Sequence, residues 1–137
     1  MEVHVFEGKS SIDVKEKALT ELNANEDELF IRESEVNGGF LKAKKYKLEI
    51  ITKDDIVKYA KEYIIEIAKH MGINVNIEAK KRDHFIQLNL FSENSSILIG
   101  KGGKTIDAMQ TLIKNSILNT TGFKVNIMID VEDYKEK

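Results

Sequence analysis

The sequence predicts an α+β protein built of two small units, the first ordered βαββ and the second αββααβ. Two observations carry this prediction. In some segments apolar residues alternate with polar ones, as in strands with one buried face, and in others they recur every three or four positions, as in amphipathic helices. The length, 137 residues of which 42% are hydrophobic, suits one ordinary domain or two small ones. Half-buried strands under amphipathic helices form two-layer domains.

The first unit is expected over residues 1–51. Its first strand ends at Gly8, and Ser10 or Ser11 can cap the helix that follows. Asn37-Gly38-Gly39 is a strong turn signal between the second and third strands. The apolar positions that define these elements are, in chain order, Val3, Val5, Val14, Ala18, Leu19, Leu22, Leu29, Phe30, Ile31, Tyr46, Leu48 and Ile50.

The second unit is expected over residues 52–137. Thr52-Lys53-Asp54-Asp55 has the pattern of a capping box, and the stripe that follows includes Ile56, Ala60 and Ile64. The predicted elements are a helix over about 54–71, strands near 73–79 and 84–91, a short helix over 95–99, a long helix over 104–119 and a strand near 123–130. The stripe of the long helix is formed by Ile106, Met109, Leu112, Ile113 and Ile117.

A glycine loop, Gly100-Lys101-Gly102-Gly103, joins the two later helices. Glycines let a backbone approach a ligand closely, and the N–H groups that open a helix suit an anion. A P-loop would need glycine where Leu98 stands, and a dinucleotide fingerprint would need it at Thr105. The pattern I-G-x-x-G between two helices is instead that of a KH domain, whose loop clamps the backbone of about four nucleotides. The alternative is an ordinary helix-turn-helix corner closed by glycines.

The order αββααβ is that of a type II KH domain, and the residues around the loop carry a closer resemblance. ILIGKGGKTIDAMQTLI, followed by a strand and IDVEDYKEK, resembles the Jag or KhpB family, the sporulation-stage-III-J-associated proteins. Residues 1–51 are similar to its N-terminal Jag-N domain, in which a glycine turn precedes G-F-L, here Gly38-Gly39-Phe40-Leu41. The resemblance covers essentially the whole chain. It also implies that the family's C-terminal arginine–histidine domain is missing, because that domain starts near a sequence like Tyr134-Lys135-Glu136-Lys137.

The resemblance implies single-stranded RNA binding by an RNA chaperone or post-transcriptional regulator linked to cell-envelope growth and division. Its implied partner is a small KH-domain protein or a second copy of the chain. We expect the loop backbone and lysines to meet phosphates, and apolar residues beside the loop, Leu98 among them, to support unpaired bases. Gly102 stands where family loops commonly carry a second basic residue, which predicts a weaker grip. The expected contact residues are Ile99, Gly100, Lys101, Gly102, Gly103, Lys104, Ile106 and Lys124.

A second function class stays open, an interaction scaffold in which the KH fold mediates dimerisation and the missing domain supplies most RNA affinity. The net charge of −2 favours it, because RNA binding then depends on a local basic patch. Lys80-Lys81-Arg82 is either such a patch or a solvated hairpin. The same choice applies to a basic cluster in residues 1–51, which hold 8 basic and 11 acidic residues. That cluster comprises Lys42, Lys44, Lys45 and Lys47.

Other chemistry finds little support. The chain has no cysteine, and His4, His70 and His84 lack metal-ligand spacing. No serine lies in a nucleophile elbow, so we expect no enzyme, cofactor or metal site. The sequence shows no signal peptide and no apolar run that could span a bilayer, which predicts a cytoplasmic protein without membrane insertion. Phe85 and Phe91, out of phase with the buried residues of their strand, are expected on a sheet face that meets another surface.

Overall fold

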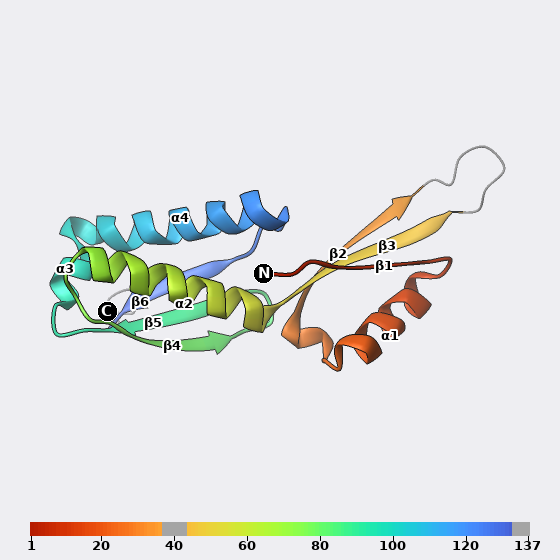
Figure 1. The fold of residues 1–137 in the computed structure, drawn as a ribbon, viewed down its shortest axis with the longest axis horizontal. Coiled ribbons are helices and arrows are strands. Elements are labelled where there is room, and N and C mark those ends of the chain that lie inside the picture. The colour runs from red at the N-terminus through yellow and green to blue at the C-terminus, as the bar shows by residue number, and fades with distance from the viewer. Residues whose placement is uncertain (37–43, 133–137) are drawn as a thin grey trace. The chain divides into compact units, whose positions relative to one another are not determined.

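The structure, a computed structural model, describes residues 1–36 and 44–132 (Figure 1). It confirms the predicted α+β class and divides into two compact units, Met1–Asp55 and Ile56–Lys137. The assignment of residues 1–51 to a Jag-N-like domain and 52–137 to a KH domain remains a prediction. The turn at Asn37-Gly38-Gly39, the G-F-L sequence, Lys42 and the segment 133–137 lie outside the described residues.

The first unit has the predicted order βαββ, with one short 3-10 turn added. Its elements are β1 (His4–Gly8), α1 (Ser11–Leu22), the turn η1 (Glu26–Glu28), β2 (Leu29–Val36) and β3 (Lys45–Thr52). The sheet order is β1-β3-β2, and both strand pairs are antiparallel. Ser10 is the cap of α1, since its side chain accepts a hydrogen bond from the Asp13 backbone N–H. The alternative cap, Ser11, is the first residue of the helix.

The core of the first unit lies between α1 and the sheet. Val14 and Ala18 of α1 are buried in one cluster with Leu48 and Ile50 of β3. The first strand differs from the expectation at Val5, which is 52% exposed, while Phe6 packs against the core. The buried face of β1 therefore falls on the even-numbered residues, because register with β3 decides which face meets the helix.

The second unit has the predicted order αββααβ. Its elements are α2 (Lys53–His70), β4 (Asn76–Lys81), β5 (Ile86–Phe91), α3 (Ser95–Ile99), the short 3-10 segment η2 (Lys101–Gly103), α4 (Lys104–Thr121) and β6 (Ile127–Val131). The sheet order is β4-β5-β6, with β4 and β5 antiparallel and β5 and β6 parallel. Figure 1 shows α2 and α4 along one face of this sheet. A parallel pair needs a crossover connection, and here α3, the glycine loop and α4 supply it.

All three strands of the second unit begin later than predicted. Ile73, Phe123 and Val125 are buried as their apolar character indicates, yet they precede the strands. Ile73 donates its N–H to Ala68 O at 2.9 Å and so closes the end of α2 instead of joining the sheet. Burial alone does not make a strand, because a strand also needs a neighbour that pairs with its backbone.

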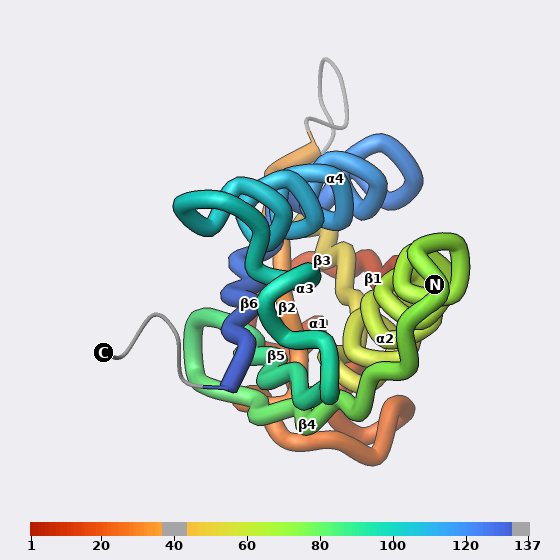
Figure 2. Tube along the Cα trace, turned by 90° about the vertical axis from the view of Figure 1, so that its left-hand side faces the viewer, coloured from red at the N-terminus to blue at the C-terminus, as the bar shows by residue number. Residues whose placement is uncertain are grey.

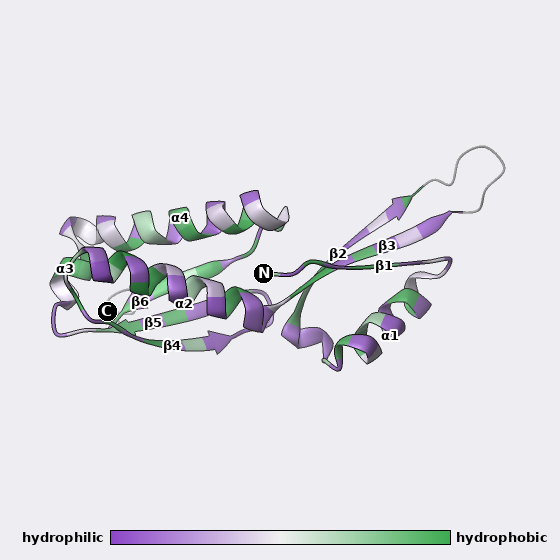
Figure 3. Ribbon diagram, viewed as in Figure 1, coloured by the Kyte–Doolittle hydropathy of each residue, from purple (hydrophilic) through white to green (hydrophobic). Residues whose placement is uncertain are grey.

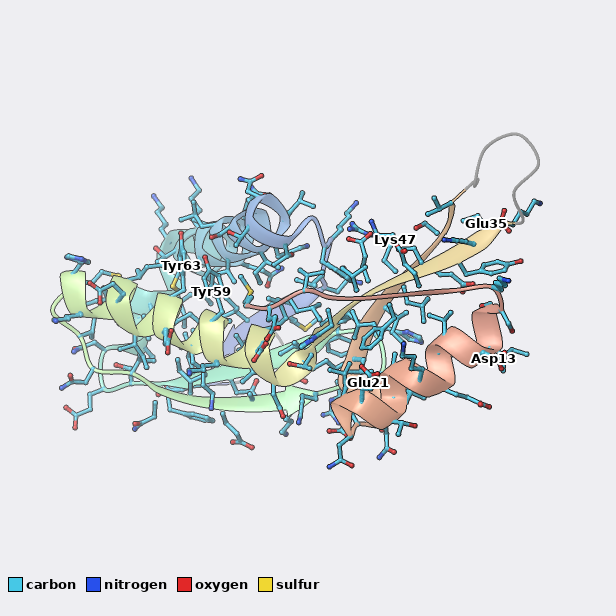
Figure 4. All side chains as sticks on the ribbon, turned by 45° about the vertical axis from the view of Figure 1, so that its right-hand side comes forward. Asp13, Glu21, Glu35, Lys47, Tyr59 and Tyr63 are labelled. Carbon is cyan, nitrogen blue, oxygen red and sulfur yellow. The ribbon has the colours of Figure 1, made fainter. Side chains whose placement is uncertain are left out.

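The core of the second unit is apolar, and the coloured ribbon shows hydrophobic residues recurring along its strands and helices (Figure 3). The completely buried residues include Ile64 of α2, Ile86, Leu88 and Leu90 of β5, Ile106, Ile113 and Ile117 of α4, and Ile129 and Val131 of β6. Leu112 was predicted in the stripe of α4 but is 51% exposed. Tyr59 and Tyr63, labelled in Figure 4, lie on α2 with ring centroids 6.0 Å apart, and the Tyr59 hydroxyl contacts Ser116 of α4.

β3 passes directly into α2 without an intervening loop. Thr52 Oγ1 accepts a hydrogen bond from the Asp55 N–H at 3.2 Å, which confirms the predicted cap. The burial of Lys53 was not foreseen. Its side chain is completely buried, its Nζ donates to Asp27 O at 2.5 Å, and it lies 5.4 Å from the centre of the Phe30 ring. This lysine is therefore part of the first unit's interior.

Candidate nucleic-acid interface

The glycine loop between α3 and α4 is built from left-handed backbone. Gly100, Gly102 and Gly103 have φ angles of 72°, 66° and 79°, which side-chain-bearing residues rarely adopt. The Gly100 N–H donates to Ser96 O at 3.0 Å and ends α3, and the Gly103 N–H donates to Gly100 O at 3.2 Å. The loop thus ends α3 and starts α4 at Lys104 within four residues.

The glycines differ in what surrounds them. A Cβ atom on Gly100 would lie 2.2 Å from Thr105 Oγ1 and 2.9 Å from the Thr105 backbone N, so the first turn of α4 excludes any side chain there. A Cβ on Gly102 would meet nothing within 4 Å, and the residue is exposed. Gly100 is therefore required by packing and by backbone angle, whereas Gly102 is required by backbone angle alone.

The loop carries positive charge at an exposed position. Lys101 and Lys104 are both exposed, and among the described residues neither amine forms an ion pair. The Lys104 N–H is already bonded to Lys101 O, but the dipole of α4, an 18-residue helix, still places partial positive charge at this end. An anion at this loop would meet two lysines and a helix N-terminus together.

The apolar residues predicted beside the loop are less accessible than expected. Ile99 is half-buried, but Leu98 and Ile106 are completely buried. Leu98 and Ile106 belong to the core next to the loop and present no surface to a base. The apolar groove floor expected from the sequence is therefore limited here to Ile99.

Two hollows beside α4 form what we call the groove, on the side of the helix that faces β6. Figure 2 shows β6 beneath one end of this helix. One hollow, of about 330 Å³, is lined by His84, Phe85, Gln110, Lys114, Asn126, Ile127 and Met128. A second, of about 210 Å³, is lined by Gln110, Thr111, Lys114, Asn115, Leu118, Lys124 and Val125. The two hollows share Gln110 and Lys114 in their walls, so they are neighbours along the helix.

Lys124 lies in the second hollow and not at the loop. It follows the C-terminal end of α4, and a helix of 18 residues is about 27 Å long. Lys101 and Lys104 therefore lie at the loop end of α4, and Lys124 lies beyond the opposite end of the helix, in the wall of the second hollow. A ligand that touches all three must extend along the length of α4, as an extended polymer can.

β6 forms the open edge of the sheet beside this groove. The Ile86 N–H donates to Asn126 O and the Glu132 N–H donates to Leu90 O, both at 3.0 Å. In a parallel ladder this places the backbone groups of even-numbered residues toward β5 and those of odd-numbered residues toward the open edge. There the Ile129 N–H donates to Gln110 Oε1 at 3.0 Å.

Sequence reasoning missed Gln110 and Lys114. Lys104, Thr111 and Lys114 recur at intervals of seven and three, and Gln110 adjoins this face, so all lie on one side of a helix. That polar stripe was available in the sequence. The edge of β6, which lies next to this stripe, could not be read from the sequence, because only the fold brings the strand beside the helix.

The remaining candidates lie elsewhere. Lys80, Lys81 and Arg82 are exposed around the β4–β5 turn, which is separated from α3 by the six residues of β5, about 20 Å. Phe85 was expected on a face meeting another surface, but it is half-buried in the wall of the first hollow. Phe91 is 39% exposed.

In residues 1–36 and 44–132 no three His, Cys, Asp or Glu side chains come together as a metal site would require. Within the same ranges, no helix has the length and apolar character needed to cross a membrane. His70 Nε2 lies 3.3 Å from Glu66 Oε1, one helical turn away on α2.

An αββααβ unit with a glycine loop between its second and third helices is a type II KH domain, and this is the class of protein that the fold defines. Residues 57–129 match the family model described as KhpA/KhpB, KH domain. Because the match covers more than half of the chain, the protein belongs to the KhpA/KhpB KH-domain family. The predicted resemblance is confirmed.

Three curated relatives are named RNA-binding protein KhpB. The chain is 26% identical to the Bacillus subtilis (strain 168) protein, with 95% of the chain and 64% of the relative covered. It is 25% identical to the Clostridium symbiosum protein, with coverages of 100% and 64%. Identity to the Lactiplantibacillus plantarum protein is 29%, over 56% of the chain and 24% of the relative. The chain thus spans less than two thirds of the length of each of these relatives.

Proposed function

We propose that this protein binds single-stranded RNA, with the backbone of the RNA held at the loop Gly100–Gly103. The observation that carries the proposal is the loop itself. Its glycines have positive φ angles, and Lys101, Gly102 and Lys104 are exposed at the positive end of α4, whereas Gly103 is buried beneath them. The names of the three relatives support RNA as the ligand.

The groove supports a single strand as the ligand. Proteins read single-stranded RNA by splaying its bases and contacting their faces and edges. The two hollows along α4 provide space for bases, and Phe85 contributes an aromatic wall to the first. Lys124 then meets a phosphate at the far end of the groove. Ile99 borders the loop, and Ile106 supports it from the core.

The cellular role that we propose is that of an RNA chaperone or post-transcriptional regulator in the cytoplasm, linked to cell-envelope growth and division. The family resemblance supports this role. We also propose a protein partner, either a small KH-domain protein or a second copy of the chain. No cofactor or catalytic step is needed for such a function.

A second candidate is an interaction scaffold in which the KH unit serves protein contacts. Exposed apolar side chains on its helices favour this alternative, because water-facing apolar surface is often covered by another protein. Ile65 of α2, Ile97 of α3 and Leu112 of α4 are each 51% exposed. Gly102, in place of a second cation in the loop, also favours it.

The experiment that separates the two is a double replacement in the loop, Lys101→Asp with Gly102→Asp. Aspartate tolerates left-handed backbone better than most residues, and the space beside Gly102 is open, so the fold is expected to survive. Two carboxylates where phosphates should lie are expected to abolish binding in a fluorescence-anisotropy titration with single-stranded RNA. Wild-type affinity should also fall steeply with salt.

A matched control places the same charge change on α1, by Ile12→Asp with Lys17→Asp. Both residues are exposed, and Ile12 lies in the first turn, where an acid is favourable. The control is expected to bind RNA as the wild type does. Equal losses in both variants would indicate a non-specific charge effect, and unchanged binding of the loop variant would place the RNA contact elsewhere.

A further inference from the structure

Gln110 occupies a distinctive position in the groove. It projects from α4, its Oε1 accepts the Ile129 N–H of β6 at 3.0 Å, and it borders both hollows. The side chain thus spans from the helix to the open edge of the sheet. Because α4 rises about 1.5 Å per residue, Gln110 lies about 9 Å along the helix from Lys104, between the loop and Lys114.

The hydrogen bond between Gln110 and Ile129 affects which hydrogen-bonding groups the edge of β6 presents to a ligand. An open edge strand offers N–H donors and carbonyl acceptors. At Ile129 the donor is already used by Gln110, and at Val131 it is used by Asp130 Oδ1, at 2.9 Å. A base that lies against this part of β6 therefore meets the Gln110 carboxamide in place of the Ile129 N–H. The identity of residue 110 then enters the hydrogen-bond pattern that the base must match.

We propose that Gln110 is a specificity-determining residue of the groove, which reads the edge of the base next to the loop-bound phosphate. This inference rests on the proposed RNA binding. Lys114 shares both hollows but contributes a point charge, which attracts phosphates whatever the base. Affinity accordingly comes mainly from the lysines and the loop, and discrimination among bases comes from Gln110.

The test uses the full chain and four short single-stranded RNAs of equal length, which differ only in the central bases (A, C, G or U). Gln110→Met keeps the length of the side chain and removes its hydrogen-bonding groups. The ratio between the tightest and weakest of the four dissociation constants is expected to change by about fivefold or more, in line with the discrimination that base contacts supply. Gln87→Met is the matched control, because it makes the same substitution on β5, at a residue that lines neither hollow.

The outcomes are distinguishable. Wild-type protein that binds none of the four RNAs would overturn the proposed function and this inference with it. Wild-type binding, with ratios in Gln110→Met equal to those in the wild type and in Gln87→Met, would overturn only the role of Gln110. A changed ratio in Gln110→Met alone would support it.

A second variant keeps the test decisive where Gln110→Met does not fold. Gln110→Glu retains an oxygen for the Ile129 N–H and replaces the amide nitrogen with a second oxygen. Its negative charge should weaken the binding of all four RNAs by a similar factor, and higher salt should reduce this effect. A changed ratio among the four at matched salt supports the role of Gln110, and an unchanged ratio contradicts it.

Discussion

Each of the two units is a three-stranded sheet covered by helices, but the two differ in how their positively charged side chains are paired. In the first unit two cations lie close to carboxylates: Arg32 Nη2 is 2.7 Å from Glu49 Oε2, and Lys15 Nζ is 2.5 Å from Glu26 Oε1. In the second unit Lys101, Lys104 and Lys124 are exposed, and in the described part of the chain they form no ion pair. Lysines without a partner can bind a phosphate without first breaking a salt bridge.

Strand topology explains where the groove arises. The first sheet is antiparallel throughout, and β1 and β2 at its edges flank β3. The second sheet contains the parallel pair β5 and β6, so the chain must cross over the sheet between them. That crossover carries the glycine loop and lays α4 beside the open edge of β6. The crossover thus produces both the loop and the groove.

Truncating a core side chain in each unit should have the largest effect on the stability of that unit. Leu48→Ala in β3 and Ile113→Ala in α4 both empty completely or almost completely buried positions, and each should lower the unfolding free energy of its own unit by about 2–5 kcal/mol. Denaturant titrations followed by NMR signals from each unit will measure this. RNA affinity should fall only in Ile113→Ala. A loss of RNA binding in folded Leu48→Ala would show that the first unit also takes part.

Glycine replacement sharpens the comparison. Gly100→Ala introduces backbone strain of about 1–3 kcal/mol, because φ 72° with ψ 173° is a conformation that essentially only glycine adopts, and it adds a clash with Thr105. Both RNA affinity and the stability of the second unit should therefore fall. In Gly8→Ala the new Cβ would lie 2.5 Å from Val14 Cγ2, and overpacking should cost about 1–3 kcal/mol in the first unit. Anisotropy titrations should find RNA binding intact in Gly8→Ala. Undiminished binding by Gly100→Ala would contradict the role of the loop.

Removing one lysine from each unit should have a smaller, specific effect. Lys104→Ala is expected to reduce the slope of log affinity against log salt by about 0.7, the value for one phosphate contact on a single strand. Lys47→Ala, in the basic cluster of β3, should leave the slope unchanged if that cluster is a solvated strand face. A reduced slope in Lys47→Ala would instead make the cluster a binding patch.

The smallest effect concerns the Arg32–Glu49 pair. The hydrogen bond from Arg32 lowers the pKa of Glu49 below its usual value, assisted by the charges of Arg32 and Lys47 and opposed by burial. A lowered pKa contributes stability above the unfolded-state pKa, and this contribution is lost as the pH falls through the folded-state value. Arg32→Met should therefore cost the first unit less than about 1 kcal/mol at neutral pH, because the pair is partly exposed.

The measurement is thermal unfolding of the first unit at a series of pH values. The difference between Arg32→Met and the wild type should disappear in acid, once Glu49 is protonated in both. RNA binding should not change at any pH. A difference that persists in acid would mean that the variant acts through packing of the arginine stem.

Much of the fold was predictable from periodicity, because burial on one face leaves a local trace in the sequence. The alternation of Leu48 and Ile50, the spacing of Ile106, Ile113 and Ile117, and the caps at Ser10 and Thr52 were all confirmed. Leu112 was misplaced, since periodicity predicts which face is apolar but not how wide the covered stripe is.

The glycine loop was equally readable, because backbone with positive φ demands glycine and so marks the sequence directly. Residues 100–104 and the class of domain could therefore be named from the chain alone. The groove could not. Gln110 and Lys114 line the hollows because the fold places α4 beside β6. Lys124, which follows the end of the helix, lines the second hollow with them.

The sequence by itself determined the order of elements, the KH loop and the family, because each depends on residues that are neighbours along the chain. Tertiary structure decided the rest. It placed the Ile129 N–H against Gln110, buried Lys53 with its amine over the Phe30 ring, and buried Leu98 and Ile106. These features join residues distant in sequence, and only the packing of a finished fold brings their atoms within the few ångströms over which hydrogen bonds and apolar contacts act.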